Sequence, residues 1–170
     1  RENPEVISYL DEENKYTQSI LKSTKSFQKK LFNEMKSRIK EDDNSVPYFY
    51  NDYWYVTKYE KGKDYPIYTR KHKQLDAEEE IILDVNLLAK DYKYFRVSGI
   101  SISPDNKKVS YGVDTLSRRI YTIKIKNLDT DEMYSDNIVG VNSYAAWADD
   151  SETIFYTGKD SQTLRSGKIY

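Results

Sequence analysis

The nonapeptide SPDNKKVSY (residues 103–111) recurs in altered form as ADDSETIFY (residues 148–156). Asp105 matches Asp150 and Tyr111 matches Tyr156, with about 45 residues between the copies. In each copy an apolar run is followed by a polar turn and then by a second apolar run. In the first copy, Pro104 presets the backbone φ angle that a tight turn requires. A period of about 40–45 residues built from several short strands is typical of a β-propeller.

The sequence around this repeat predicts further short strands. Alternating apolar and polar residues, bounded by turn residues, favour antiparallel strands at a spacing of about 8–12 residues. We expect strands over 46–50, 53–57, 65–70, 80–84 and 119–126, with turns at 51–52 and 61–64, and a fourth strand of the repeat after a turn at 127–132. The segment 46–84 fits the same plan as an earlier, more divergent blade. The 17 tyrosines suit sheets with one partly wet face.

The first 45 residues follow a different, helical period. Apolar residues recur at helical spacing over 6–21, after Pro4 and Glu5, and again every four residues from Phe27 to Ile39. Thr24 or Ser26 is the expected N-cap of the second helix. That helix is rich in lysine, a pattern shared by helices that bind membranes or nucleic acids, although a solvated outer face is the interpretation we favour.

Composition excludes several kinds of site. The chain has no cysteine and one histidine, His72, which excludes disulfides, thiol nucleophiles and histidine-rich metal sites. No apolar run is long enough for a membrane span, and 27 basic against 28 acidic residues give no overall attraction to nucleic acid.

The remaining candidates for chemistry are weak. The segment Gly99-Ile100-Ser101-Ile102-Ser103 lacks the second glycine of a nucleophile elbow, and His72 reads as an exposed loop residue. Asp129, Asp131 and Asp136 lack the spacing of a calcium loop. Tyrosine-rich strands could stack bases, but no basic groove accompanies them. We therefore assign no catalytic, cofactor-binding or metal-ligating residue within 1–170.

Motifs along most of the chain resemble one peptidase family. Several motifs follow one another in the order and spacing of that family, namely residues 9–16 (YLDEENKY), 34–48 (EMKSRIKEDDNSVPY), 53–55 (YWY), 65–70 (YPIYTR), 114–121 (DTLSRRIY) and 147–150 (WADD). Residues 83–86, 94–95, 103–105 and 127–130 continue it. This arrangement, over about residues 8–157, resembles the oligopeptidase B (protease II) branch of the prolyl oligopeptidase family.

The resemblance implies a fold and an activity. Members carry a seven-bladed β-propeller and a C-terminal α/β-hydrolase domain, on which the N-terminal helices pack. A Ser-Asp-His triad in the hydrolase domain catalyses acyl transfer without a cofactor, and the branch cleaves short peptides after Lys or Arg. The propeller is expected to admit oligopeptides and exclude folded proteins. Helix packing on the hydrolase domain would involve Tyr9, Leu10, Tyr16, Phe27, Leu31 and Ile39.

We therefore predict a mainly β fold in two parts. Residues 1–45 form an N-terminal helical extension, and residues 46–170 form about blades 1 to 3 of a propeller, the third incomplete. Because propellers close with about 4–8 blades, and because the chain begins without Met, we expect a fragment of a longer protein that is inactive alone and whose triad lies beyond Tyr170.

Two other functions stay open at this point, a non-enzymatic propeller scaffold and a prolyl-specific member of the same family. The expected partners are oligopeptide substrates and the hydrolase domain, with no nucleic acid and no membrane. The absence of cysteine and the resemblance favour the cytoplasm, or the periplasm if a signal segment was removed.

Overall fold

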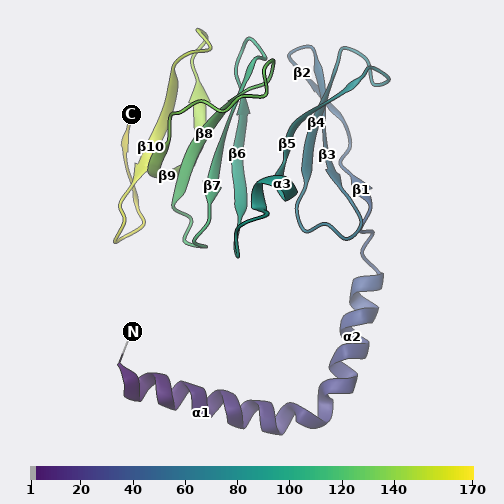
Figure 1. The fold of residues 1–170 in the computed structure, drawn as a ribbon, viewed down its shortest axis with the longest axis vertical. Helices are drawn as coiled ribbons and strands as arrows, with labels where there is room; N and C mark the ends of the chain where they lie inside the picture. Colours follow the sequence, from purple (N-terminus) through teal and green to yellow (C-terminus); the bar gives the residue numbers. More distant parts are fainter. Residues whose placement is uncertain (1–2) are drawn as a thin grey trace. The chain divides into compact units, whose positions relative to one another are not determined.

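The computed structural model describes residues 3–170, which divide into two compact units, one ending at Glu41 and one running from Asp42 to Tyr170. The N-terminal unit contains α1 (Pro4–Leu21), a 3₁₀ turn (Lys22–Thr24) and α2 (Lys25–Ser37) (Figure 1). The side chain of Asn3 accepts a hydrogen bond of 2.9 Å from the amide of Glu5, and Pro4 opens the helix. Both predicted helices are confirmed, and α1 begins at the predicted proline.

The apolar stripes of both helices face outward within this unit. No residue of α1 or α2 is buried, and Tyr16, Phe27 and Ile39 are each more than 60% exposed. The predicted cap of α2 is wrong in its chemistry. Thr24 occupies the N-cap position, but its hydroxyl donates to the carbonyl of Leu21 at 2.8 Å, and no side chain caps the helix amides.

The second unit begins with an antiparallel sheet of five strands. These are β1 (Asp43–Asn44), β2 (Tyr48–Tyr50), β3 (Tyr53–Tyr59), β4 (Ile67–His72) and β5 (Glu79–Asp84). β1 and β2 both pair with β3, along the edge opposite β4. Positive φ angles of 45° at Asn51 and 65° at Asp52 form the two-residue hairpin turn predicted between β2 and β3.

Six further strands pair in the order β11-β10-β9-β8-β7-β6. They are β6 (Arg96–Ile102), β7 (Lys108–Asp114), β8 (Tyr121–Asn127), β9 (Ile138–Trp147), β10 (Ile154–Lys159) and β11 (Ser166–Ile169). The short helix α3 (Val85–Ala89), which the sequence did not predict, connects β5 to β6 and lies between the two sheets (Figure 1). The carboxylate of Asp84 caps it by accepting from the amides of Asn86 and Leu87.

Strand β9 pairs with two neighbouring strands, one along each part of its length. Residues 138–141 pair with β8, with Gly140 at φ 71° in a bulge between Val139 and Val141, and residues 141–147 pair with β10. The backbone of Ser143 lies against Gly99 and Gly112, where added Cβ atoms would stand 2.1 Å from the Ser143 oxygen and 2.6 Å from its Cα. Side chains are therefore excluded at both glycines because another strand occupies their space.

The repeat detected in the sequence is also a repeat of turn geometry. Asn106 and Ser151, which match between the copies, have φ angles of 63° and 59°. The carboxylates of Asp105 and Asp150 accept hydrogen bonds from the amides of Lys107 and Glu152, at 3.1 and 2.9 Å. Each aspartate satisfies the backbone of its own turn, which is the physical reason for the acidic residue at this position.

One hydrophobic core joins the two sheets. Tyr55 and Leu83 of the first sheet, Val85 of α3, and Val109 and Tyr111 of the second are all at most 5% exposed and belong to one cluster. Arg70, at 3% exposure, lies at the same junction. Its guanidinium contacts Glu80 of β5 at 2.7 Å, donates to the carbonyl of Asn106 at 2.6 Å, and covers the ring of Tyr53 at 4.2 Å.

Substitution of Arg70 tests this junction. Arg70→Ala removes the donor to the Asn106 carbonyl and leaves a cavity, so the free energy of unfolding of the full-length protein should fall by about 2–3 kcal/mol. Arg96→Ala, an arginine on the exposed end of β6, is the matched control and should change it by less than about 0.5 kcal/mol. Equal effects of the two variants in chemical denaturation would contradict the assigned role.

Candidate functional site

The structure places the weak sequence candidates in structural roles. His72 ends β4, is exposed, and packs its ring on Tyr53 with 5.0 Å between centroids. Gly99 to Ile102 lie within β6, where Gly99 has a φ of 67° at a bulge, and a nucleophile elbow requires a strand-to-helix turn there. Asp129 lies in a turn and Asp131 pairs with Lys126. Among residues 3–170, no group of three histidine or acidic residues is arranged to hold a metal ion. No helix among these residues is long and apolar enough to cross a membrane.

Five loops lie together at one end of the sheets. The side-chain amide of Asn51 donates to the carbonyl of Pro104 at 2.8 Å, which joins the β2–β3 and β6–β7 loops. The β4–β5 loop joins them through a bond of 2.8 Å from the amide of Lys73 to the carbonyl of Asp52. The β8–β9 loop is joined by a hydrogen bond of 2.7 Å from the amide of Leu128 to the carbonyl of Lys107. The β9–β10 loop is joined by one of 3.0 Å from the amide of Asp105 to the hydroxyl of Ser151.

This end of the sheets, which we call the acidic end, carries a marked excess of carboxylates. Its loops contain Asp52, Asp76, Glu78, Asp105, Asp129, Asp131, Glu132, Asp136, Asp149, Asp150 and Glu152, against Lys73 and Lys107. Burial would raise the pKa of Asp105, but hydrogen bonds from the Ser103 hydroxyl and the Lys107 amide outweigh it and lower the pKa. Hydrogen bonds from Thr153 and Glu152 lower the pKa of Asp150. Both carboxylates are therefore ionised at neutral pH.

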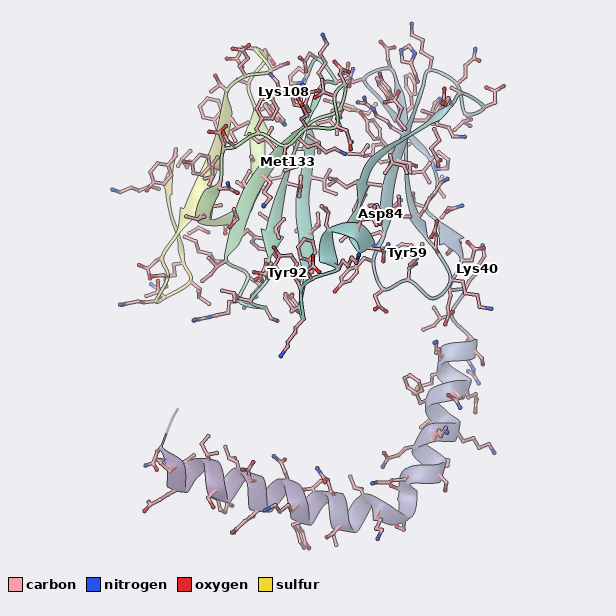
Figure 2. The ribbon with its side chains drawn as sticks, in the orientation of Figure 1. Lys40, Tyr59, Asp84, Tyr92, Lys108 and Met133 are labelled. Carbon is pink, nitrogen blue, oxygen red and sulfur yellow. The ribbon has the colours of Figure 1, made fainter. Side chains whose placement is uncertain are left out.

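The loops at the opposite ends of the strands have the reverse balance. They contain Lys61, Lys63, Lys90, Lys93, Arg118, Arg119 and Arg165, against Glu60, Asp64, Asp91 and Asp160. Figure 2 shows Lys108 near the acidic end of the second sheet and Tyr92, which follows α3, near the other end. The net charge of −1 for the whole chain conceals this polarity, because basic residues of the opposite end, the helices and the strands compensate the acidic end in the sum.

A cleft opens where the edges of the two sheets meet. It has a volume of about 340 Å³ and is lined by the tyrosines Tyr48, Tyr50, Tyr55, Tyr68 and Tyr144. The other lining residues are Val56, Thr57, Thr69, Ile82, Ile100, Ser101 and Ile102, so none of the lining side chains is charged. We call this feature the tyrosine cleft. Its walls come from β2 to β5 on one side and from β6 and β9 on the other.

Strand register brings the tyrosines of the first sheet together. Tyr48 lies opposite Tyr55, and Tyr50 opposite Tyr53, so all four rings share one face of the sheet. The rings of Tyr48 and Tyr55 stack with centroids 5.3 Å apart and planes 20° apart. Tyr48, Tyr50 and Tyr144 are 59–63% exposed at the mouth, whereas Tyr55 is 5% exposed at the base.

The sequence indicated one wall of this cleft and could not indicate the other. Alternation over residues 46–57 predicts that the tyrosines of β2 and β3 share a face. Tyr144 joins them through β9, and nothing in its local sequence marks it as a neighbour of residue 48. The acidic loops beside the rings disfavour the phosphate backbone of a nucleic acid.

Comparisons with known proteins cover nearly the whole chain. A family model described as the N-terminal β-propeller domain of prolyl oligopeptidase matches residues 1–170. The chain is 38% identical over 99% of its length to dipeptidyl aminopeptidase BI of Pseudoxanthomonas mexicana, and 34% identical over 94% to Protease 2 of Moraxella lacunata. It matches the structure of oligopeptidase B from Leishmania major with a TM-score of 0.88, at 33% identity over 99% of this chain.

The chain spans about a quarter of the length of these proteins. It covers 25% of the Pseudoxanthomonas mexicana protein, 24% of the Moraxella lacunata protein and 24% of the Leishmania major protein. The match is therefore to one N-terminal portion of much longer polypeptides.

The buried tyrosines generate a prediction about alkaline pH. Burial raises the pKa of Tyr55 and of Tyr111 from 10.0 to about 12. Because the unfolded chain loses these protons near pH 10 and the folded chain near pH 12, the stability they provide is complete below pH 10 and is lost as the pH rises to 12. The free energy of unfolding of Tyr55→Phe and Tyr111→Phe proteins should fall less steeply over this range than that of the wild type.

For Tyr55→Phe we also predict the stability at neutral pH. The hydroxyl of Tyr55 is buried and forms no hydrogen bond among the described residues, so Tyr55→Phe should leave stability at neutral pH unchanged or slightly raised. Tyr92→Phe, at an exposed ring, is the control. A slope between pH 10 and 12 that is identical in all three variants and the wild type would contradict the prediction.

Proposed function

The chain belongs to the prolyl oligopeptidase family, whose N-terminal β-propeller domain it carries, and from this premise we propose that it is part of a serine oligopeptidase that cleaves short peptides after Lys or Arg. The catalytic triad of such an enzyme would lie in an α/β-hydrolase domain beyond Tyr170. The single observation that carries this proposal is the likeness to oligopeptidase B, at 33% identity and a TM-score of 0.88 over nearly the whole chain. The names of the relatives, a dipeptidyl aminopeptidase and a protease, also support a peptidase.

In this proposal the propeller selects substrates by size. A channel lined by the inner strands of a ring of blades admits an extended peptide, whereas a folded protein is too wide to enter. The short edge strands β1 and β2, and the edge strand β6, are the elements of this chain that would line such a channel. The exposed stripes of α1 and α2 would be covered by the hydrolase domain, since a helix with an apolar stripe requires a partner surface.

A second activity has a specific observation in its favour. The relative at 38% identity is named a dipeptidyl aminopeptidase, and such an enzyme removes two residues from a free amino terminus. A prolyl preference and a non-enzymatic scaffold are the remaining alternatives. A cytoplasmic location stays a prediction, which fractionation of the source cells would test.

Specificity can be measured on the full-length protein with four chromogenic peptides. Blocked peptides ending in Arg or Lys before the reporter should be cleaved at least tenfold more efficiently, by kcat/KM, than a blocked peptide ending in Pro. A dipeptide reporter with a free amino terminus forms the fourth arm. Preference for Pro would move the protein to another branch, preference for the free dipeptide would favour the aminopeptidase, and absence of turnover on all four would favour the scaffold.

Size selection requires its own experiment. One Arg-containing cleavage sequence is presented in a short peptide, in a loop of a stably folded protein, and in the same protein after unfolding by carboxymethylation or heat. Cleavage of the short peptide should exceed that of the folded protein by about a hundredfold or more, because the folded protein cannot enter the channel. Equal rates on the peptide and the folded loop would rule out a gate, whatever the preferred residue at the scissile bond.

A further inference from the structure

We propose that the tyrosine cleft is a binding subsite for a cationic side chain, Lys or Arg, of a peptide, at a position remote from the scissile bond. The proposal rests on the proposed peptidase function for the origin of the peptide. It assigns to the propeller a part in recognising the substrate as well as in excluding large ones.

The geometry of the cleft suits one long side chain. A volume of about 340 Å³ lies at the small end of ligand pockets, which span roughly 300–1,000 Å³. The mouth is formed by Tyr48, Tyr50 and Tyr144, from two sheets, and the stacking of Tyr48 on buried Tyr55 holds the first of these rings in place. The cleft therefore exists before any ligand arrives, so little binding energy is needed to order it.

The lining chemistry favours a cation. Aromatic faces attract Lys and Arg through the ring quadrupole, and tyrosine hydroxyls add hydrogen-bond acceptors. No lining side chain carries a positive charge that would repel the ligand. The nearby guanidinium of Arg70 is paired with Glu80 at 2.7 Å, so its charge is compensated within the core.

The lining also stays neutral over the physiological range. Burial raises the pKa values of Tyr48 and Tyr68 as well as that of Tyr55, so these hydroxyls remain protonated. A neutral hydroxyl can both donate and accept hydrogen bonds.

The acidic end provides a second reason for a cationic occupant. Tyr50 directly precedes the Asn51-Asp52 turn, and Ile102 directly precedes the loop that contains Asp105. The cleft therefore opens next to loops with a strong excess of carboxylates. A positively charged peptide is attracted to this end and an acidic one is repelled, an effect that salt will weaken.

The test compares peptides cleaved by the full-length protein. Each blocked peptide contains one cleavable Arg, and a remote position, protected by an N-methylated peptide bond, carries Arg, citrulline, norleucine or Glu. Citrulline has the shape of arginine without its charge. The remote position is moved stepwise away from the cleavage site. At the spacing that reaches the cleft, remote Arg should lower KM about fivefold relative to citrulline, with kcat unchanged.

Variants connect this effect to the cleft. Tyr50→Ala and Tyr144→Ala should each reduce the ratio of Arg to citrulline toward one, whereas Tyr50→Phe, which keeps the aromatic face, should retain most of it. Tyr134→Ala, a partly exposed tyrosine outside the cleft, is the matched control and should leave the ratio intact. Tyr134→Ala should also cleave a minimal blocked Arg reporter, too short to reach the cleft, as the wild type does.

The outcomes separate this proposal from the proposed function. A second set of the same peptides, in which the bond after the cleavable Arg is also N-methylated, cannot be cleaved. Binding of this set to the full-length protein is measured by fluorescence anisotropy in low and high salt. Preferential binding of the Arg peptide that is lost in Tyr50→Ala supports the cleft even if no peptide is cleaved after Lys or Arg. Equal binding of Arg and citrulline peptides, tighter binding of norleucine, or a preference that survives both alanine variants would overturn it, even if the protein proves to be a Lys/Arg-specific peptidase.

Discussion

Arg70 lies at the junction of the two sheets, and the relative position of their edges depends on its contacts. Its guanidinium, 3% exposed, contacts a carboxylate on β5, a carbonyl in the β6–β7 loop and the face of Tyr53. A planar group with five donors can satisfy partners on several elements at once, which an ammonium group could not do in the same geometry. The apolar core around it supplies the larger burial, but core contacts are not directional, whereas those of Arg70 specify one arrangement.

The loops at the acidic end extend this constraint along the sheets. Asn51 and Asn106 exchange hydrogen bonds across the first junction, and the hydroxyl of Ser151 accepts from the backbone amide of Asp105 at the next. The residues that complete each turn thus also join it to its neighbour. The same positions collect the carboxylates, since aspartate and asparagine are the residues that tight turns favour. The acidity of this end therefore follows in part from turn chemistry, and it gives the structure an electrostatic direction that the net charge does not reveal.

Much of this fold was accessible from the sequence. The two helices, most strands, the Asn51-Asp52 turn and the repeat around Asp105 and Asp150 are confirmed, because each is specified by local periodicity or turn chemistry. The resemblance to oligopeptidase B is confirmed by the family and structural matches. Helix α3 was missed because five residues give too short a pattern, and the capping role of Thr24 was wrong because its hydroxyl bonds to the preceding turn instead.

The sequence by itself determined the class of fold and the family, since a repeat of turns and strands and an ordered set of motifs are properties of the chain read along its length. Only the tertiary structure decided which residues share a site. Tyr48 and Tyr144 are separated by most of the second unit, and they line one cleft because β9 packs closely against β6 at Gly99 and against β7 at Gly112. The acidic end likewise arises from five separate loops. Packing between sheets brings such residues together, and no local pattern records which distant strand will lie beside them.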